Sequence, residues 1–372
     1  MTPKRPEMQW TMTPIKLWIL SGLMLGVVMA LSVFLLTRKP EQKPAPTVPT
    51  TTAAPTANPD LIEPETTGYN VGLCLPDGSE AWTAIGTQLK DLLLQRGHQV
   101  SLVQGDGTSF TQNKLLLTLM EQAVDCIVIA PVDSAGLQEA SQKAEEMKIP
   151  IISYGSLWMD SPVVKGYVCY DYRQMGASVA RYIAQRFSLD TAGDKVYTLE
   201  LFMGAPEDYN AFALYEGIME ELRPYLDSGV LVCGSSRTAF EDCCISGWSE
   251  AAAAKACKGR LRSYGTDGPD MILCASDSIA AGVIRSLKEV GVTRWPVITG
   301  NGATSAGMAS MQAGEQALTV STDPSEPAQA VCDMVDYLLA GTEPPFPLES
   351  IHNHVADIPT ALCGFTLRLP AA

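Results

Sequence analysis

Residues 71–93 read VGLCLPDGSEAWTAIGTQLKDLL, which is a short apolar run, a polar turn and then a helical pattern. The run Val71–Leu75 is apolar on both faces, as expected for a parallel strand that helices cover on both sides. After the turn, Ile85, Leu89 and Leu92 recur at helical spacing. The stretch therefore predicts one strand followed by one helix.

The same unit recurs along the chain. Further apolar runs begin at Gln99, Cys126 and Ile151, about 24–28 residues apart, which is the usual length of a strand and its helix. A second series follows Asp171, with strands expected over residues 197–203, 230–233, 271–275 and 297–299. Each series has enough strands for one three-layer lobe, so we expect an α/β protein with two doubly wound lobes.

The N-terminal segment predicts a membrane helix. Residues 17–37 contain no charged side chain, and a helix of that length crosses a bilayer core. The alternative is a cleaved signal peptide, whose apolar core is usually about 7–15 residues and is followed by a small-x-small site. Only Val28–Ala30 resembles such a site, and it lies inside the apolar run. We expect residues 1–16 to form a tail and 17–37 an uncleaved transmembrane signal anchor.

Residues 38–67 read as a linker. Positions 40–67 carry seven Pro and seven Thr, a composition typical of an extended spacer. A spacer between a membrane helix and a folded body holds that body away from the bilayer. The expected location is the cell membrane, crossed once, with the folded body on the extracytoplasmic face.

Charge is distributed unevenly along the chain. The 26 Lys and Arg against 41 Asp and Glu give a net charge of −15, yet residues 1–43 are +4, so the remaining residues are −19. Phosphate backbones repel such a body, because nucleic-acid affinity depends mostly on contacts between cations and phosphates. We expect no nucleic-acid partner.

The ten cysteines do not form a metal-binding or disulfide-rich pattern. No CxxC pair occurs, and five of the cysteines lie in apolar runs, where a thiol behaves as a small buried hydrophobe. Cys243, Cys244 and Cys257 lie in more polar sequence, and a single disulfide among them stays open.

Polar and aromatic residues follow the expected strands. In open α/β sheets, ligands bind beyond the carboxyl ends of the strands. Amides, hydroxyls, carboxylates and aromatic rings at these positions can bind the hydroxyl groups of a polyhydroxyl solute and stack on its apolar face. The alternative is ordinary turn and cap chemistry, and Asp277 or Ser278 could cap the next helix. The segments are Asp77–Trp82, Ala130–Asp133, Tyr154–Ser156, Glu207–Asn210, Ala275–Asp277 and Gly300–Gly302.

Taken in order, these segments resemble those of bacterial sugar-binding proteins that feed ABC importers, especially the xylose and multiple-sugar receptors. The resemblance runs from about Val71 to Pro359 and rests on GLCLPDGSEAW, DCIVIAPVDSAGL, ELFMGAPEDYNA, GWSEAAA, ILCASDSIAAG and PVITGNGA. It implies a type I periplasmic-binding fold, in which two lobes joined by three hinge strands close on one small molecule.

The resemblance also implies where the chain crosses between lobes. The crossings are expected near Asp171–Tyr172, Thr322–Asp323 and Asn353–Ala356. The N-terminal lobe would then hold residues 68–171 with 323–352, and the C-terminal lobe residues 172–322 with 353–372.

The resemblance carries over to the ligand site only in part. Trp82 and Trp248 match the family's two stacking aromatics, Asn210 its amide and Asp277 its aspartate. Charged family positions are replaced by Ala81, Gly155, Ser156 and Gly302, and a family asparagine by Ser276. We therefore expect a different, larger or less polar solute, or weak binding of a sugar. The expected ligand-binding residues are Glu80, Trp82, Tyr154, Ser156, Asn210, Trp248, Ser276, Asp277 and Asn301.

The resulting prediction is a membrane-tethered, monomeric solute-binding protein for an ABC importer. A sensory role, in which the loaded protein contacts a sensor kinase, is the alternative. An enzyme is disfavoured, because the chain has three histidines and no GxSxG, HExxH or P-loop motif. His352 and His354 could place two imidazoles on one face of a strand, but few acids and no nearby cysteine support a metal. We expect no cofactor.

Overall fold

The computed structural model describes residues 68–370. The expected tail, transmembrane anchor and linker lie outside these residues. Within the described part, none of the helices combines the length and the hydropathy that a bilayer crossing needs.

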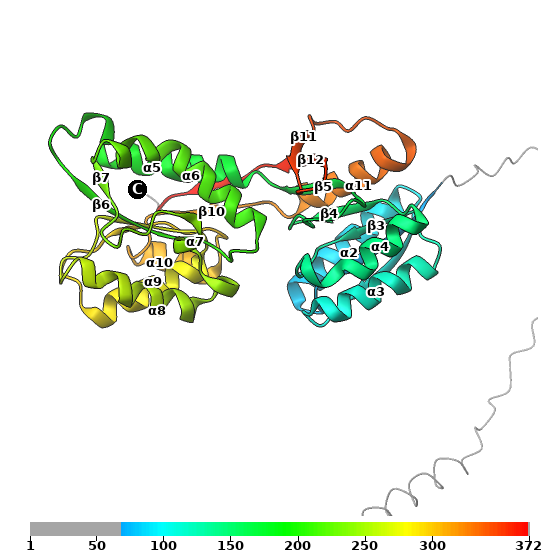
Figure 1. The fold of residues 1–372 in the computed structure, drawn as a ribbon, viewed down its shortest axis with the longest axis horizontal. Coiled ribbons are helices and arrows are strands. Elements are labelled where there is room, and N and C mark those ends of the chain that lie inside the picture. Colours follow the sequence, from blue (N-terminus) through cyan, green and yellow to red (C-terminus); the bar gives the residue numbers. More distant parts are fainter. Residues whose placement is uncertain (1–67, 371–372) are drawn as a thin grey trace, which may run out of the picture. The chain divides into compact units, whose positions relative to one another are not determined.

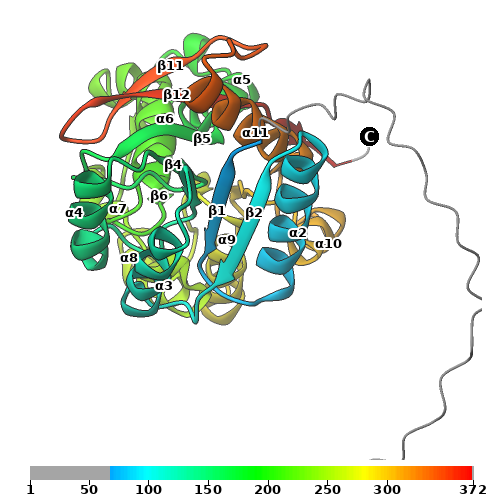
Figure 2. The ribbon, with the colours of Figure 1, turned by 90° about the vertical axis from the view of Figure 1, so that its right-hand side faces the viewer.

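A seven-stranded sheet forms the first lobe, and Figures 1 and 2 show its strands and helices. The strand order is β11-β12-β5-β4-β3-β1-β2, and every neighbouring pair is parallel except β11 with β12. This order and direction are typical of the doubly wound lobe that the sequence predicts. The strands are β1 (Asn70–Leu75), β2 (Gln99–Gln104), β3 (Cys126–Ile129), β4 (Ile151–Tyr154), β5 (Val164–Tyr170), β11 (Glu349–His352) and β12 (Asp357–Cys363).

Helices cover both faces of this sheet. Val71 and Leu73 of β1 pack with helices α2 and α11, whereas Cys74 of the same strand packs on the other face with α3 and α4. Because successive side chains of a strand point to opposite faces, a run that is apolar throughout can supply two cores. The helices are α2 (Glu80–Gln95), α3 (Ser109–Glu121), α4 (Gln138–Met147) and α11 (Ser325–Ala340).

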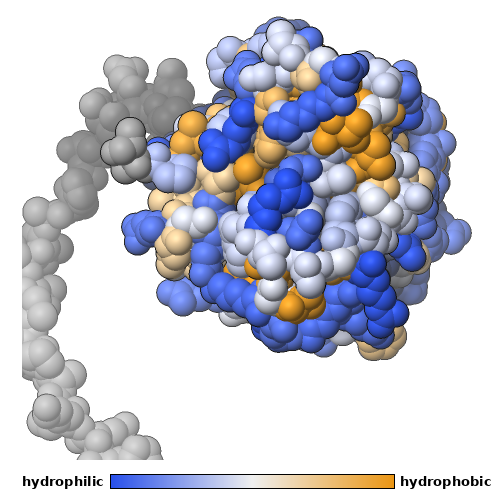
Figure 3. Space-filling view, turned by 90° about the vertical axis from the view of Figure 1, so that its left-hand side faces the viewer, coloured by the Kyte–Doolittle hydropathy of each residue, from blue (hydrophilic) through white to orange (hydrophobic). Residues whose placement is uncertain are grey.

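A smaller parallel sheet, of order β7-β6-β8-β9, forms the second lobe. Helices α5 and α6 pack closely because Gly176 and Gly217 leave room for the facing backbone, which a Cβ at either position would overlap. Figure 3 shows that hydrophilic side chains dominate one face of this lobe, with small hydrophobic patches between them. Its elements are α5 (Tyr172–Phe187), β6 (Tyr197–Phe202), α6 (Tyr209–Asp227), β7 (Leu231–Val232), α7 (Phe240–Cys243), α8 (Glu250–Arg260), β8 (Met271–Cys274), α9 (Asp277–Val290), β9 (Val297–Ile298) and α10 (Ser305–Gln312).

The chain passes between the two lobes at three places. The first is at Asp171, between β5 and α5, and the second lies between β10 (Thr319–Ser321) and α11. The third is at Gly364–Phe365, between β12, which pairs with β5, and β13 (Thr366–Arg368), which pairs with β10.

The expected third crossing at Asn353–Ala356 is wrong. These residues form the turn between β11 and β12, where the Asn353 side-chain oxygen accepts hydrogen bonds from the backbone N–H groups of Val355 and Ala356. The Asn353 amide nitrogen donates to the Trp158 and Ser161 carbonyls, which fixes the turn to the first lobe. Residues 353–363 therefore belong to the seven-stranded sheet.

All ten cysteines are free thiols, and nine of them are buried. Cys243 and Cys257 lie in the core of the second lobe, and Cys244 is partly exposed. The structure thus contains no disulfide among these three residues.

Candidate functional site

Loops from both lobes enclose a cavity of about 390 Å³, which we call the inner pocket. Seven of the nine expected ligand-binding residues line it, and five aromatic rings make up much of its wall. Within the described chain, no lysine or arginine lines this pocket, and Asp208 is its one carboxylate. The expected residues that line it are Trp82, Tyr154, Ser156, Asn210, Trp248, Ser276 and Asn301.

Trp82 stands at the start of α2, directly after the turn that follows β1. Its ring meets that of Tyr154, at the end of β4, edge to face, with centroids 6.4 Å apart and an interplanar angle of 74°. This is a favourable arrangement for two aromatic rings, so each fixes the orientation of the other. One wall of the inner pocket is therefore a preformed aromatic surface.

Trp248 forms part of the opposite wall and is held by a strained turn. Gly247 and Trp248 both have positive φ, 61° and 54°, and for a bulky residue this conformation is costly unless packing enforces it. The packing comes from Gly204, since a Cβ at that position would overlap the indole. The backbone N–H of Ile245 also donates to the Gly204 carbonyl at 3.0 Å. The indole is thereby fixed against the loop after β6.

Asn210 joins the two lobes. Its amide nitrogen donates to the Gly155 carbonyl at 2.7 Å, and its oxygen accepts from the Tyr167 hydroxyl at 2.7 Å. Asn210 belongs to α6 of the second lobe, whereas Gly155 and Tyr167 belong to the first. One amide hydrogen and one lone pair remain for other partners. The side chain that was expected to bind ligand is thus also a bridge between lobes, which we call the Asn210 bridge.

Two expected site residues do not line the inner pocket. Glu80 is exposed in the first turn of α2, where a carboxylate interacts favourably with the helix dipole. Asp277 is only 3% exposed, and its carboxylate accepts four hydrogen bonds, from Thr304 N and Oγ1, Gln316 Nε2 and Thr319 Oγ1, at 2.7–3.0 Å. Both positions are corrections to the expected site: Glu80 faces solvent, and Asp277 holds the loop after β9 in place.

The cap of α9 was also placed one or two residues too late. Ser276, rather than Asp277 or Ser278, is the N-cap, and its hydroxyl accepts from the backbone N–H of Ile279 at 3.2 Å. Ser276 still lines the inner pocket. Because the hydroxyl accepts only one hydrogen bond in the cap, it can still donate its own proton and accept one more hydrogen bond.

The polar and aromatic lining residues that were not among the expected ones include Asp208, Tyr170 and Tyr172. Asp208 is the N-cap of α6 and accepts from the backbone N–H of Asn210 at 2.9 Å. Burial raises the pKa of the Asp208 carboxyl, although hydrogen bonds from Asn210 and Trp248 act in the opposite direction. Asp208 lies in the segment Glu207–Asn210 that the sequence singles out, so its place after a strand was the available signal. Tyr170 and Tyr172 flank the first crossing and carried no such signal.

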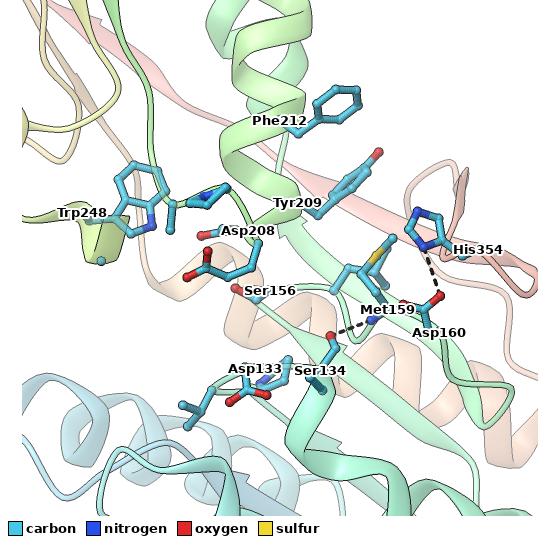
Figure 4. Close-up of a pocket in the computed structure, with 18 of the residues that line it drawn as sticks. Asp133, Ser134, Ser156, Met159, Asp160, Asp208, Tyr209, Phe212, Trp248 and His354 are labelled. Atoms are coloured by element: carbon cyan, nitrogen blue, oxygen red, sulfur yellow. Dashed lines mark hydrogen bonds and ion pairs between the residues drawn. The ribbon is translucent and has the colours of Figure 1, made fainter. Parts of the chain in front are cut away.

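A second cavity, of about 860 Å³, adjoins the inner pocket, and we call it the outer cavity (Figure 4). The two share Pro131, Ser156, Asp208 and Trp248. The outer cavity also contains a half-buried and an exposed aromatic ring of α6 and several carboxylates. These further lining residues include Asp133, Asp160, Glu207, Tyr209, Phe212 and Glu241.

His354 stands at the edge of the outer cavity, where its Nδ1 lies 3.1 Å from an oxygen of Asp160 (Figure 4). The Nδ1 of His352 accepts from the backbone N–H of His354, so the two imidazoles do not face a common point. Between residues 68 and 370, no group of three or more His, Cys, Asp or Glu side chains is arranged to hold a metal ion. The described residues thus offer no metal centre.

The known proteins that this chain resembles are periplasmic binding proteins. Residues 71–343 match the family described as the periplasmic binding protein domain. The multiple sugar-binding periplasmic protein SbpA of Azospirillum brasilense is 32% identical over 290 residues, which cover 76% of this chain and 80% of that protein. The multiple sugar-binding periplasmic receptor ChvE of Rhizobium radiobacter is 31% identical over 280 residues, covering 74% and 79%.

Solved structures share the same architecture. An ABC transporter solute binding protein from Clostridium phytofermentans with bound β-D-glucose superposes with a TM-score of 0.74 at 30% identity. The match covers 81% of this chain and 94% of that one. The two-lobed fold is therefore that of a type I periplasmic binding protein, as the sequence predicted.

Proposed function

Because this chain belongs to the periplasmic binding protein family, we propose that it is a membrane-tethered, extracytoplasmic receptor that delivers a sugar or sugar derivative to an ABC importer. The observation that carries this proposal is the inner pocket, where Trp82 and Trp248 stand in one cavity with hydroxyl and amide groups. Aromatic faces stack on the apolar face of a sugar ring, and the polar groups bind its hydroxyls. The named sugar-binding relatives support the same ligand class.

The sparse charge of the inner pocket bears on which sugar binds. Asp208 is its one carboxylate among the described lining residues, and Gly155 and Ser156 stand where the resemblance implies charged groups. Hydrogen bonds to charged groups contribute about 1.5–3 kcal/mol each, so three fewer would weaken the binding of an ordinary aldose about a thousandfold or more. The ligand is thus expected to gain affinity from contacts other than charged hydrogen bonds.

The membrane tether forms part of the proposal. Its support is the sequence: residues 17–37 are long and apolar enough for a transmembrane helix, and a Pro/Thr-rich linker follows. Extraction of membranes at alkaline pH should leave the full chain in the pellet, and protease added from the extracytoplasmic side should release its body. Recovery of the intact chain in the soluble fraction would contradict the tether.

Transport and sensing require the same closure of the lobes, so the neighbouring genes distinguish them. An adjacent ATPase and permease would support import, and an adjacent histidine kinase would support the sensory alternative. The proposed role is binding rather than catalysis, by a monomeric body without a cofactor.

Titration calorimetry of the full chain tests the proposed ligand class. The protein should be purified in a detergent whose headgroup is not a sugar, because a glycoside detergent would compete. We expect saturable binding of at least one saccharide, with glucose and xylose weaker than micromolar. Sub-micromolar binding of glucose or xylose would contradict the expected weak binding of ordinary aldoses. The absence of binding across a saccharide panel would contradict the proposed function.

The matched variants are Trp82→Ala and Phe110→Ala. Trp82 lines the inner pocket, whereas Phe110 is 68% exposed at the start of α3 and lines neither the inner pocket nor the outer cavity. Trp82→Ala should weaken binding at least about tenfold, because one stacking face is lost, and Phe110→Ala should leave it unchanged.

A further inference from the structure

Resting on that proposed function, we propose that the ligand is a saccharide of at least two units. One unit would occupy the inner pocket and the next would lie in the outer cavity. The two cavities are adjacent, their volumes differ, their walls are held together, and the lining of the outer cavity is suited to a sugar.

The shared lining shows that the two cavities are adjacent. Ser156 of the first lobe and Asp208 and Trp248 of the second contribute to both cavities. Asp208 and Trp248 are fixed by the start of α6 and by Gly204, so they form a constant border between the two spaces. A ligand can therefore extend from one cavity into the other past these three side chains.

The volumes leave room for more than a single sugar ring. Small-molecule pockets usually measure roughly 300–1,000 Å³, and the inner pocket, at about 390 Å³, lies near the lower end of that range. The outer cavity, at about 860 Å³, is more than twice as large. A monosaccharide in the inner pocket would leave this larger space to solvent.

The outer cavity exists although the lobes are already in contact beside it. The Asn210 bridge binds Gly155, and the neighbouring residues in the chain, Ser156 and Tyr209, are themselves in the cavity wall. The two walls are therefore held together at this edge by a partly buried hydrogen bond of 2.7 Å. The space follows from the shape of the loops and does not require the lobes to part at this point.

The lining suits a second sugar unit. Tyr209 and Phe212 project from the first turn of α6 toward the cavity (Figure 4), and Phe212 is 41% exposed. Their rings offer a stacking face, and Asp133 and Glu207 offer acceptors for hydroxyl groups. No lysine or arginine lines the cavity within residues 68–370, so a phosphorylated or uronic sugar would be repelled.

The test is calorimetry of the full chain with two matched pairs of probes, glucose with cellobiose and xylose with xylobiose. The disaccharide of at least one pair should bind at least about tenfold more tightly than its monosaccharide, because it adds an aromatic contact in the outer cavity. Tyr209→Ala should reduce this ratio to near one while leaving monosaccharide binding unchanged. Trp82→Ala, in contrast, should weaken both members of a pair.

Two further variants keep the test decisive. Phe212→Ala repeats the loss of a ring in the outer cavity in case Tyr209→Ala does not fold, and Phe110→Ala is the control outside both cavities. If no saccharide binds, the proposed function fails. If each monosaccharide binds as tightly as its disaccharide, or the outer variants leave the ratio unchanged, the proposed function stands and the two-unit ligand is overturned.

Discussion

The indole of Trp248 lies directly on the backbone of Gly204, so that no side chain larger than hydrogen fits beneath it. Gly204 comes two residues after β6, where the chain enters the wall of the outer cavity. The contact links the core of the second lobe to the aromatic surface that a ligand would meet.

Gly204→Ala should therefore displace the indole. We expect ligand affinity to fall at least about tenfold, with a change in tryptophan fluorescence, because a Cβ at Gly204 would occupy the space of the Trp248 ring. Titration calorimetry measures the first effect and emission spectra the second. Gly259→Ala is the matched control, since a Cβ at Gly259 meets nothing within 4 Å. Unchanged affinity of Gly204→Ala would show that the position of Trp248 does not matter for binding.

Asn210→Ala should loosen the contact between the lobes. Loss of a buried side chain with two hydrogen bonds is expected to lower the free energy of unfolding by about 1–3 kcal/mol. It should also raise the radius of gyration of the ligand-free protein in small-angle X-ray scattering.

The matched control for this variant is Asn113→Ala. Asn113 is also buried, but its hydrogen bonds, to Glu139 and Ala140, stay within the first lobe. This variant should lose stability without a change in radius. Equal radii for the two variants would argue that the Asn210 bridge does not set the separation of the lobes.

Asp208 should make stability depend on pH. Burial raises the pKa of its carboxyl in the folded state, so the folded protein binds the proton more tightly than the unfolded chain does. The ionised carboxyl therefore lowers the free energy of unfolding at pH values above the pKa of the folded state. This penalty disappears as the pH falls through the pKa of the folded state toward the pKa of the unfolded state.

Asp208→Asn removes the charge and keeps a good N-cap. The free energy of unfolding of the variant minus that of the parent should be larger at pH 7 than at pH 4. Urea unfolding at a series of pH values measures the difference. A difference that does not vary with pH would show that Asp208 does not titrate between the two states.

The thiols should be inert until the protein unfolds. Burial raises the pKa of Cys74, Cys243 and Cys257 to about 12, and that of the partly exposed Cys244 to about 11. Because the thiolate is the reactive form, iodoacetamide at pH 8 should label the folded protein slowly at every cysteine. If the chain is then denatured without a reductant and alkylated again, mass spectrometry should show ten labels. Eight labels would reveal a disulfide.

The sequence predicts a strand well when both faces of that strand are buried. Val71–Leu75 and Cys126–Ala130 were found because buried parallel strands are apolar on both faces, so a short run is enough to identify them. Strand β11 is mostly exposed and β12 contains Pro359, so neither presents such a run. The third crossing was misplaced for this reason: a polar turn between two unrecognised strands was interpreted as a hinge.

The sequence predicted which loops form the site better than it predicted which residues of those loops line the inner pocket. Trp82 and Trp248 both line the inner pocket, as the resemblance implies, although only Trp82 comes directly after the turn that follows a strand. Ser276 and Asn301 line the inner pocket, whereas Glu80 and Asp277, from similar loops, do not. The difference lies in the direction of each side chain. That direction depends on long-range partners, such as Gln316 and Thr319 for Asp277, which no local pattern reveals.

The return of the chain to the first sheet has a consequence for biosynthesis. Strand β12 lies between β5 and β11, so two of the seven strands of the first lobe come from residues 349–363, near the end of the chain. The first lobe cannot complete its sheet until nearly the whole polypeptide has been synthesised and has reached the compartment where it folds. A ribosome that stalls within the last thirty or so residues would leave β5 as an unpaired edge, open to aggregation.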